Sequence, residues 1–221
     1  MPRPAPAAPV LALLREAYPD VTTELGWRTP FELLVATVLS AQSTDRGVNA
    51  VTPALFARFP TAERLAQAPL EEIEAAVRTL GLYRSKARHL KALSQILVER
   101  HDGQVPSLRS ALEALPGVGR KTASVVLATA FGVPALAVDT HVFRVAHRLG
   151  WSRATTAAGT ETDLCRRVPR RDWIWCHHAL IHHGRRLCHA RRPDCEACPL
   201  VPYCPRLGVQ DALRTPQCEE A

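Results

Sequence analysis

Apolar residues recur along most of the chain at the three- and four-residue spacing of amphipathic helices. A first helix is predicted from Val10 to about Tyr18, and a second begins at Thr29-Pro30, where proline suits the first helical position. Apolar residues nearly surround the axis of this second helix, which predicts that it is buried in a core. No alternating run of apolar and polar residues indicates a strand. The pattern therefore predicts an all-α fold.

Later helices are marked by the same periodicity and by start and stop signals. Asp45 is the expected N-cap of a helix ending near Phe59, and Pro106-Ser107 is expected to cap one ending near Leu115. A helix from about Val118 is expected to stop at Phe131-Gly132-Val133-Pro134. The other predicted helices span about residues 61–67, 70–78, 84–100, 139–149, 159–168 and 171–187.

The composition is that of a soluble globular protein, with 47% hydrophobic and 22% charged residues in a chain of 221. No apolar run approaches the roughly 20 residues that span a bilayer, which excludes an integral membrane protein. The Pro/Ala-rich residues 1–9 contain no apolar signal-peptide core, so we expect an intracellular protein whose first residues are flexible.

The charge narrows the choice of partner. The formal net charge is +7, and residues 141–192 alone carry 11 arginines against three acidic residues. Such a balance favours polyanions, nucleic acid first and acidic membrane second, although an ordinary basic surface would look the same. Only three basic residues are lysines, namely Lys86, Lys91 and Lys121. Because arginine cannot act as an amine nucleophile, each lysine is a candidate for chemistry that needs an amine.

A glycine turn separates two predicted helices at Leu115-Pro116-Gly117-Val118-Gly119. Its glycines can adopt positive φ and leave backbone N–H groups uncovered, and the following helix adds the positive end of its dipole. Such a turn can hold a DNA phosphate without reading the base sequence. A simple helix connection is the alternative, but the neighbouring Arg120-Lys121 favours the phosphate site.

Asp139 follows the apolar run 135–138 and opens a predicted helix. A carboxylate in this position is most often an N-cap. Near a lysine amine, the same carboxylate can accept a proton or stabilise positive charge that develops on a sugar carbon. The position alone leaves both roles open.

Four of the seven cysteines form the pattern C-x6-C-x2-C-x5-C, at Cys188, Cys195, Cys198 and Cys204. Four thiolates so close in sequence can surround one metal centre, and both zinc and a [4Fe-4S] cluster accept four cysteines. The other three, Cys165, Cys176 and Cys218, have no such spacing. His178 and His182 share a helix face, but without a third ligand nearby we expect packing or DNA-backbone contacts for the histidines of this helix.

Taken together, these segments closely resemble the endonuclease III branch of the helix-hairpin-helix DNA glycosylases. The resemblance extends from about Thr22 to Cys204, nearly the whole chain. It is carried by Leu115–Ala123, Ala137–Arg144 and the cysteine pattern, and by Pro30–Leu34, Leu39–Asp45, Gly81–Ala87 and His177–Arg185.

The resemblance implies a fold of two lobes. One lobe is a six-helix barrel with the hairpin, at residues 25–135, and the other joins residues 10–24 to 136–204 and carries the cluster. Residues 1–9 and 205–221 are then flexible tails. A [4Fe-4S] cofactor held by the four clustered cysteines is implied, rather than zinc. The implied partner is damaged double-stranded DNA, bound by a monomer in the cytoplasm and associated with the nucleoid, without a membrane.

The resemblance also implies the chemistry. Lys121 is the attacking amine and Asp139 the essential carboxylate of a bifunctional glycosylase and lyase of base excision repair. It removes an oxidised or ring-saturated pyrimidine that has been flipped out of the duplex, forms a Schiff base with the sugar and cuts the strand by β-elimination. The implied DNA-binding residues are Gln42 and Leu82, which wedge into the duplex, and Gly117, Gly119, Arg120, Thr122, His141, Arg185, Arg186 and Arg191.

Two other functions stay open at this point. A mismatch-specific adenine glycosylase of the same superfamily usually has a further C-terminal domain, and this chain stops 17 residues after Cys204. That enzyme also generally lacks the lysine. A non-catalytic DNA-binding or damage-sensing module could use the same hairpin. Trapping with borohydride distinguishes the lyase from the module.

Overall fold

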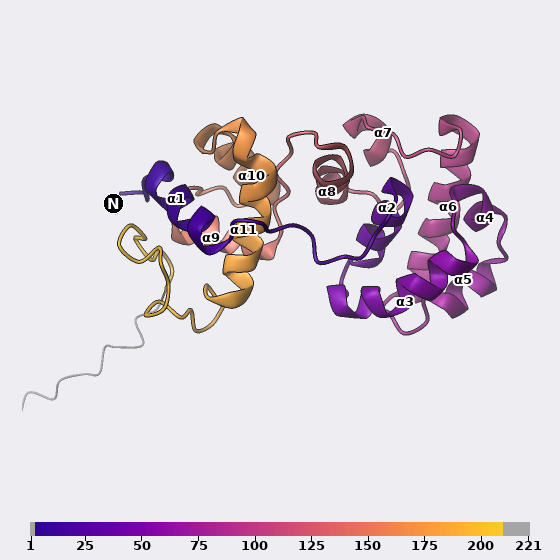
Figure 1. Ribbon diagram of the computed structural model, residues 1–221, viewed down its shortest axis with the longest axis horizontal. Coiled ribbons are helices and arrows are strands. Elements are labelled where there is room, and N and C mark those ends of the chain that lie inside the picture. The colour runs from indigo at the N-terminus through magenta and orange to yellow at the C-terminus, as the bar shows by residue number, and fades with distance from the viewer. Residues whose placement is uncertain (1–2, 210–221) are drawn as a thin grey trace, which may run out of the picture. The chain divides into compact units, whose positions relative to one another are not determined.

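The computed structural model describes residues 3–209, and this part of the chain contains helices and no strands (Figure 1). The all-α prediction is therefore confirmed. The helices are α1 (Ala7–Ala17), α2 (Pro30–Leu39), α3 (Asp45–Arg58), α4 (Ala62–Gln67), α5 (Leu70–Ala76), α6 (Tyr83–His101), α7 (Arg109–Glu113), α8 (Arg120–Phe131), α9 (Thr140–Arg148), α10 (Ala157–Arg167), the 3-10 turn η1 (Arg170–Asp172) and α11 (Trp173–Arg186).

The chain forms two compact units. The hairpin unit consists of Thr22–Ala137 and Arg170–Trp175, and so contains α2 to α8. The cysteine unit consists of the described residues up to Val21, Val138–Pro169 and the described residues from Cys176 onward, and contains α1, α9, α10 and most of α11. Each unit is assembled from segments distant in sequence.

The core of the hairpin unit is apolar and centres on α2. Phe31 and every later residue of this helix are buried, as its apolar pattern predicts. Leu55, Ile73, Leu90 and Leu112 come from four other helices of the unit and are fully buried in the same cluster. The wide apolar surface of α2 is buried because neighbouring helices surround it.

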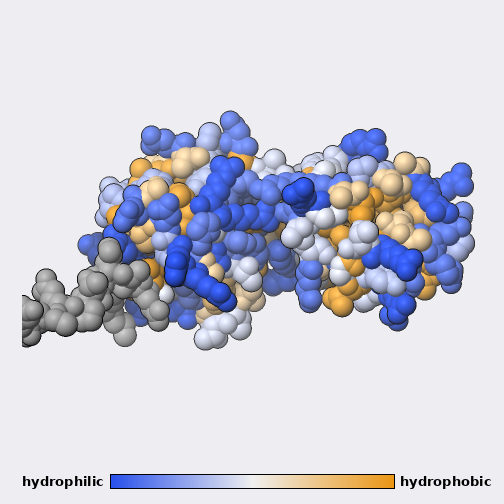
Figure 2. Space-filling model, turned by 90° about the horizontal axis from the view of Figure 1, so that it is seen from below, coloured by the Kyte–Doolittle hydropathy of each residue, from blue (hydrophilic) through white to orange (hydrophobic). Residues whose placement is uncertain are grey.

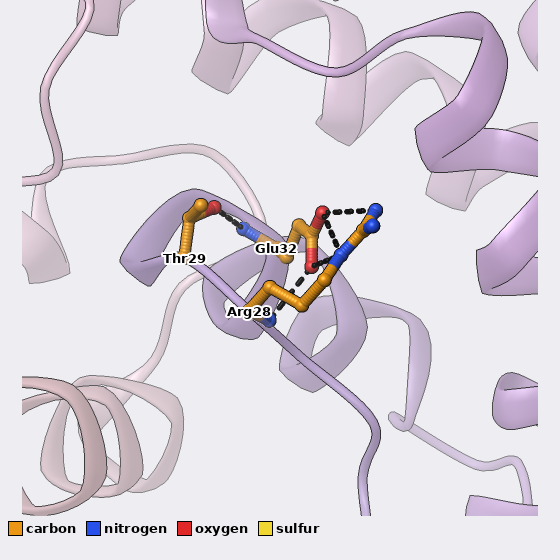
Figure 3. A network of polar contacts seen from close by, with 3 residues as sticks. All are labelled: Arg28, Thr29 and Glu32. Atoms are coloured by element: carbon orange, nitrogen blue, oxygen red, sulfur yellow. Dashed lines mark hydrogen bonds and ion pairs between the residues drawn. The ribbon is translucent and has the colours of Figure 1, made fainter.

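Three residues fix the start of α2 (Figure 3). Thr29 is the N-cap, and its hydroxyl accepts a hydrogen bond of 3.2 Å from the backbone N–H of Glu32. The buried Glu32 carboxylate accepts a 2.7 Å hydrogen bond from the backbone N–H of Arg28 and pairs with its guanidinium at 3.0 Å. This arrangement satisfies N–H groups that the first helical turn leaves without partners.

Two predicted helix starts differ from the structure. Asp45 is the first residue of α3 rather than its cap, because the hydroxyl of Thr44 accepts the hydrogen bond from the N–H of Gly47 at 3.1 Å. Helix α7 begins at Arg109, and its N-cap Leu108 provides no capping side chain. Pro106-Ser107 therefore precedes the helix without capping it. In both cases a polar residue that could serve as an N-cap lies close to the position where the helix begins.

The N-terminal segment also differs from the expectation of a flexible tail. Ala5 is buried, its N–H donates to the carbonyl of Leu149 at 2.9 Å, and its carbonyl accepts from the Trp151 indole at 2.9 Å. Helix α1 begins at Ala7, three residues before the apolar periodicity starts. The long-range hydrogen bonds, which no local pattern encodes, hold this segment. Residues 1–2 and 210–221, with Cys218, lie outside the described residues.

The described surface carries few large apolar side chains. On the face drawn in Figure 2, hydrophilic side chains dominate and hydrophobic ones are scattered between them. The exposed large apolar residues of the described chain are Leu82, Val98, Leu108 and Tyr203. No helix within residues 3–209 is long and apolar enough to cross a membrane.

Candidate active site and cysteine loop

The glycine turn joins α7 to α8. Gly117 has a φ of +78°, a conformation that suits glycine, and a Cβ built there would lie 3.0 Å from side-chain atoms of His89. Gly119 is the extended N-cap of α8, and no heavy atom lies within 4 Å of a Cβ built on it. Both glycines are exposed. The backbone around the first turn of α8 is therefore open to an anion such as phosphate.

Lys121 differs from the other two lysines in its surroundings. Lys86 donates to the Ser43 hydroxyl at 2.6 Å, and Lys91 donates to the Ala68 carbonyl at 2.9 Å. Lys121 is exposed in the first turn of α8, and its side chain has no hydrogen bond or ion pair among residues 3–209. It is the one lysine of the chain whose amine is available to a ligand.

Asp139 is the N-cap of α9, as its position predicts. Its Oδ1 accepts hydrogen bonds from the N–H groups of His141 at 2.9 Å and Val142 at 2.8 Å. Its side chain makes no other hydrogen bond or ion pair within the described residues, so Oδ2 carries no partner there. The capping role and a chemical role are compatible, because each uses a different oxygen of a half-buried carboxylate.

Gln42 and Leu82 share an unusual backbone conformation. Their φ angles are +53° and +58°, in the left-handed region that non-glycine residues rarely adopt. Gln42 is exposed, and Leu82 has 60% of its surface exposed although it is a large apolar residue. Strained, protruding residues of this kind persist where a function or strong surrounding contacts require them.

The predicted basic residues of the cysteine unit lie at and after the end of α11. Arg185 is half-buried, while Arg186 and Arg191 are exposed. The Arg186 guanidinium lies 5.9 Å from the centre of the Tyr18 ring. His141 of α9 is half-buried and contacts Arg144 through its Nδ1 at 3.1 Å. In the hairpin unit, Arg120 is exposed and Thr122 half-buried, both in the first turn of α8.

The four clustered cysteines line one cavity of the cysteine unit. Burial first, and then the neighbouring Cys204, Cys188 and Cys195, raise the pKa of the Cys198 thiol to about 11, against a lowering hydrogen bond from the backbone of Leu200. No three His, Cys, Asp or Glu side chains within residues 3–209 are arranged to hold a single metal ion. A multi-iron cluster fills the centre of its site and so holds its thiolates further apart than one zinc ion does. Four thiols around one cavity are a donor set that a [4Fe-4S] cluster accepts.

We define residues 187–209 as the cysteine loop. Two arginines of α9, which local sequence patterns gave no role, hold the start of this loop. Arg144 donates to the carbonyls of Cys188 at 2.9 Å and Gly184 at 2.8 Å. The buried Arg148 donates to the sulfur of Cys188 at 3.2 Å and to the carbonyl of His189 at 2.7 Å. Their four-residue spacing on an amphipathic helix was the available signal.

The histidines of α11 are core residues. His177, His178, His182 and His183 are all buried, which supports packing and leaves them no route to a DNA backbone. Burial, together with the neighbouring His177 and His182, lowers the pKa of His178 to about 3. The Nε2 atom of His178 is buried and has no hydrogen-bond partner among the described residues. His178 is therefore a neutral packing group at physiological pH.

The chain resembles known proteins along most of its length. Residues 35–170 match the family model described as HhH-GPD superfamily base excision DNA repair protein. The endonuclease III of Synechocystis sp. is 46% identical over 200 residues, which are 90% of this chain and 91% of that protein. The endonuclease III of Escherichia coli K12 is 47% identical over 195 residues, 88% of this chain and 92% of that protein.

The chain belongs to the HhH-GPD superfamily of base excision DNA repair proteins.

Solved structures place it in the endonuclease III branch of that superfamily. A trapped covalent intermediate of endonuclease III and DNA, an estranged-adenine complex, matches with a TM-score of 0.85 and 47% identity, over 89% of this chain and 92% of that chain. A non-covalent complex of endonuclease III and DNA matches with a TM-score of 0.86 and 46% identity, over 90% and 94%. The chain is thus a DNA glycosylase of base excision repair with lyase activity at apurinic or apyrimidinic sites.

Proposed function

We propose that this glycosylase removes oxidised or ring-saturated pyrimidines from duplex DNA through a Schiff base on Lys121, and then cuts the strand by β-elimination. The observation that carries the proposal is the exposed, unpaired amine of Lys121 directly behind the glycine turn. A family member with water as its nucleophile would need no amine there. An amine can form an iminium with a sugar carbon, and water cannot.

The reaction begins when the neutral Lys121 amine attacks C1′ of the extruded nucleotide. The N-glycosidic bond breaks, its electron pair leaves with the base, and the base takes up a proton. The attached nitrogen loses a proton, its lone pair then breaks the C1′–O4′ bond, and O4′ takes up a proton, which leaves the opened sugar as the C1′–Nζ iminium. Loss of the C2′ proton then expels the 3′ phosphate, and water finally hydrolyses the imine and releases Lys121.

Asp139 is proposed as the carboxylate that assists the first step. Its Oδ1 is occupied by two backbone hydrogen bonds, which fix the orientation of the carboxyl group. The remaining oxygen can accept a proton or stabilise positive charge on the sugar. The capping hydrogen bonds therefore orient the carboxylate for the reaction, so that Asp139 is proposed to serve both as N-cap and as reacting group.

DNA binding is proposed to use backbone contacts and wedges. The first turn of α8 with Gly117, Gly119, Arg120 and Thr122 would hold a phosphate, while Gln42 and Leu82 would occupy the space that the flipped nucleotide leaves. His141 and the arginines 185, 186 and 191 would add further contacts in the cysteine unit. The two DNA complexes of endonuclease III that match this chain support duplex DNA as the ligand.

A [4Fe-4S] cluster is the proposed cofactor, with Cys188, Cys195, Cys198 and Cys204 as its ligands. All four line one cavity, which supports a single centre bound by four thiolates. When bound, the cluster supplies a crosslink between distant points of the cysteine loop. The loop would present basic residues to the DNA backbone. Iron and acid-labile sulfide in a one-to-one ratio would support this cofactor, and zinc without sulfide would contradict it.

Borohydride trapping tests the proposed reaction. A duplex with one oxidised pyrimidine should give an irreversible protein–DNA adduct with the wild type, because reduction converts the imine into a stable amine. Lys121→Arg should give none, since it keeps the positive charge and cannot form the imine. An absence of adduct and of strand cleavage with the wild type would contradict the proposal and favour a binding module.

Asp139 allows a matched pair of variants. Asn is a good N-cap, so Asp139→Asn keeps the capping oxygen and removes the charge, whereas Asp139→Ala removes both. If the carboxylate acts in the reaction, base removal should fall by about a hundredfold or more in both variants, and only Asp139→Ala should also lose stability. Full activity in Asp139→Asn would reduce Asp139 to a cap.

A further inference from the structure

Lys86 is an ammonium group buried inside the hairpin unit. It lies in the first turns of α6, and only 4% of its surface is exposed. Its Nζ donates a 2.6 Å hydrogen bond to the hydroxyl of Ser43, a residue 43 positions earlier in the sequence. Burial lowers the pKa of this ammonium group. An apolar side chain of similar length would avoid that cost, so packing alone does not explain a lysine here.

The two ends of this hydrogen bond lie beside Gln42 and Leu82, two exposed residues of the unit with positive φ. Ser43 directly follows Gln42, and its backbone N–H closes a turn by donating to the carbonyl of Ser40 at 3.1 Å. Lys86 lies one turn after Leu82, and its own N–H donates to the Leu82 carbonyl at 3.0 Å. Each contact restrains the backbone next to a residue with positive φ.

The two loops also lie close together. A Cβ built on Gly81 would lie 3.7 Å from the carbonyl oxygen of Gln42, which is ordinary contact distance. Next to these loops, a Cβ built on Gly47 in the first turn of α3 would lie 3.7 Å from the side chain of Leu80. The Lys86–Ser43 hydrogen bond is the side-chain link that ties the two loops together, because it runs from the base of one to the base of the other.

We propose that Lys86 is a positioning residue that holds the loops of Gln42 and Leu82 at a fixed spacing, so that both side chains enter the DNA duplex in one step. The proposal rests on the wedge role given to these two residues above. Because it is buried, Lys86 is assigned no contact with substrate or reacting atoms. A charge-assisted hydrogen bond is stronger and more directional than a neutral one, which suits a link that must keep two left-handed residues in place.

The test compares Lys86→Met with Lys91→Met. Lys91 lies on the same helix and also spends its ammonium on one internal hydrogen bond, but to the Ala68 carbonyl, away from both loops. A fluorescent 2-aminopurine next to the damaged nucleotide reports unstacking independently of bond cleavage. Lys86→Met should slow the fluorescence rise by about tenfold, while Lys91→Met should match the wild type. Equal rates for the two variants would overturn the proposal.

A second pair of measurements excludes a general folding defect. Ser43→Ala removes the other partner, and its effect on the fluorescence rate should not add to that of Lys86→Met in the double variant. A substrate whose damaged nucleotide already lies in a bulge should restore base excision by Lys86→Met to within about twofold of the wild type. Additive effects, or no rescue by the bulge, would overturn the proposal.

The proposed reaction can fail separately. If the wild type shows the fluorescence rise but excises no base, the Schiff-base chemistry is wrong, and the fluorescence comparison still decides the role of Lys86. If excision proceeds and Lys86→Met is as fast as Lys91→Met, the chemistry stands and the positioning role falls.

Discussion

The two units differ in the polar side chains that they bury beside their apolar ones. The hairpin unit is built around an apolar cluster in which residues such as Leu34, Leu55 and Leu97 are almost fully enclosed. The cysteine unit encloses the arginine Arg148 and a group of buried histidines, and its loop 187–209 contains no helix. Apolar packing can hold the first unit by itself. The second also has buried apolar residues, such as Val10, Leu149 and Leu164, and adds directed hydrogen bonds and the crosslink proposed for its cysteines.

This difference suits the tasks proposed for the two units. The Lys121 amine, Gln42 and Leu82 must keep fixed positions to act as proposed. Short connections between packed helices restrict their backbone. A basic loop proposed to follow a DNA backbone exposes many arginines and has few apolar side chains. Packing against an apolar core therefore holds such a loop only weakly. Arg144 and Arg148 reach from α9 to the backbone of that loop and bind it where no helix is available.

The largest expected effect comes from removing one proposed cluster ligand. Cys198→Ser should release the iron and unfold the cysteine loop, at a cost of more than about 5 kcal/mol to the cysteine unit, because metal binding contributes directly to folding. Hydrogen exchange should rise in residues 187–209 and stay unchanged in the hairpin unit. Cys165→Ser is the control, since Cys165 is outside the cavity. Loss of protection in both units would show that they do not differ as described.

The opposite test is a cavity in the apolar core. Leu90 is fully buried in the hairpin unit, so Leu90→Ala should destabilise that unit by about 2–5 kcal/mol. Urea unfolding followed by hydrogen exchange measures the loss. Removal of iron by a chelator should leave this unit's stability unchanged, and a chelator effect as large as that of Leu90→Ala would contradict its independence.

Acid should weaken the cysteine unit through His178. Its folded-state pKa is about 3, whereas the exposed side chain of the unfolded chain titrates near its ordinary value of 6.5. The unfolded chain therefore binds the proton first, so the stabilisation is complete above pH 6.5 and is lost progressively toward pH 3. Between pH 7 and 4.5 the loss should be about 2 kcal/mol. Urea midpoints of the wild type and His178→Leu measure it. An identical pH dependence in the two would contradict the assignment.

The smallest effects should come from a matched pair of helix caps. Thr29→Ala in the hairpin unit and Thr156→Ala in the cysteine unit each remove a hydroxyl that accepts a backbone N–H. Each should cost about 1 kcal/mol, since capping energy is local and does not depend on the surrounding core. Thermal unfolding measures both. A much larger loss for one of them would show that its cap supports more than its own helix.

Local sequence patterns predicted the helices well and the links between them poorly. The burial of α2, the stop of α8 at Gly132 and the N-cap at Asp139 depend on residues a few positions apart, and all are as predicted. The choice of Thr44 over Asp45 shows that even a cap is ambiguous when two polar residues adjoin. The burial of Ala5 depends on a contact with Leu149, which no local pattern contains.

The candidate site shows the same contrast between residues that local patterns indicate and residues whose contacts are distant in sequence. The resemblance named Lys121, Asp139 and the four cysteines, and their roles stay predictions for experiment. It assigned no role to Lys86 or Arg148, because both form hydrogen bonds to residues about 40 positions away, which local patterns do not encode. Both are charged residues that helical periodicity assigns to solvent, and tertiary packing encloses them.

The most direct measurement of the central claim is to locate the trapped DNA on the protein. The wild type is reduced with borohydride on a duplex that holds one oxidised pyrimidine, and the adduct is mapped by peptide mass spectrometry. The chain has only three lysines, at 86, 91 and 121, so the attachment site can be assigned without ambiguity. The account predicts the sugar remnant on Lys121 alone. Attachment to Lys86, Lys91 or the N-terminal amine would contradict it.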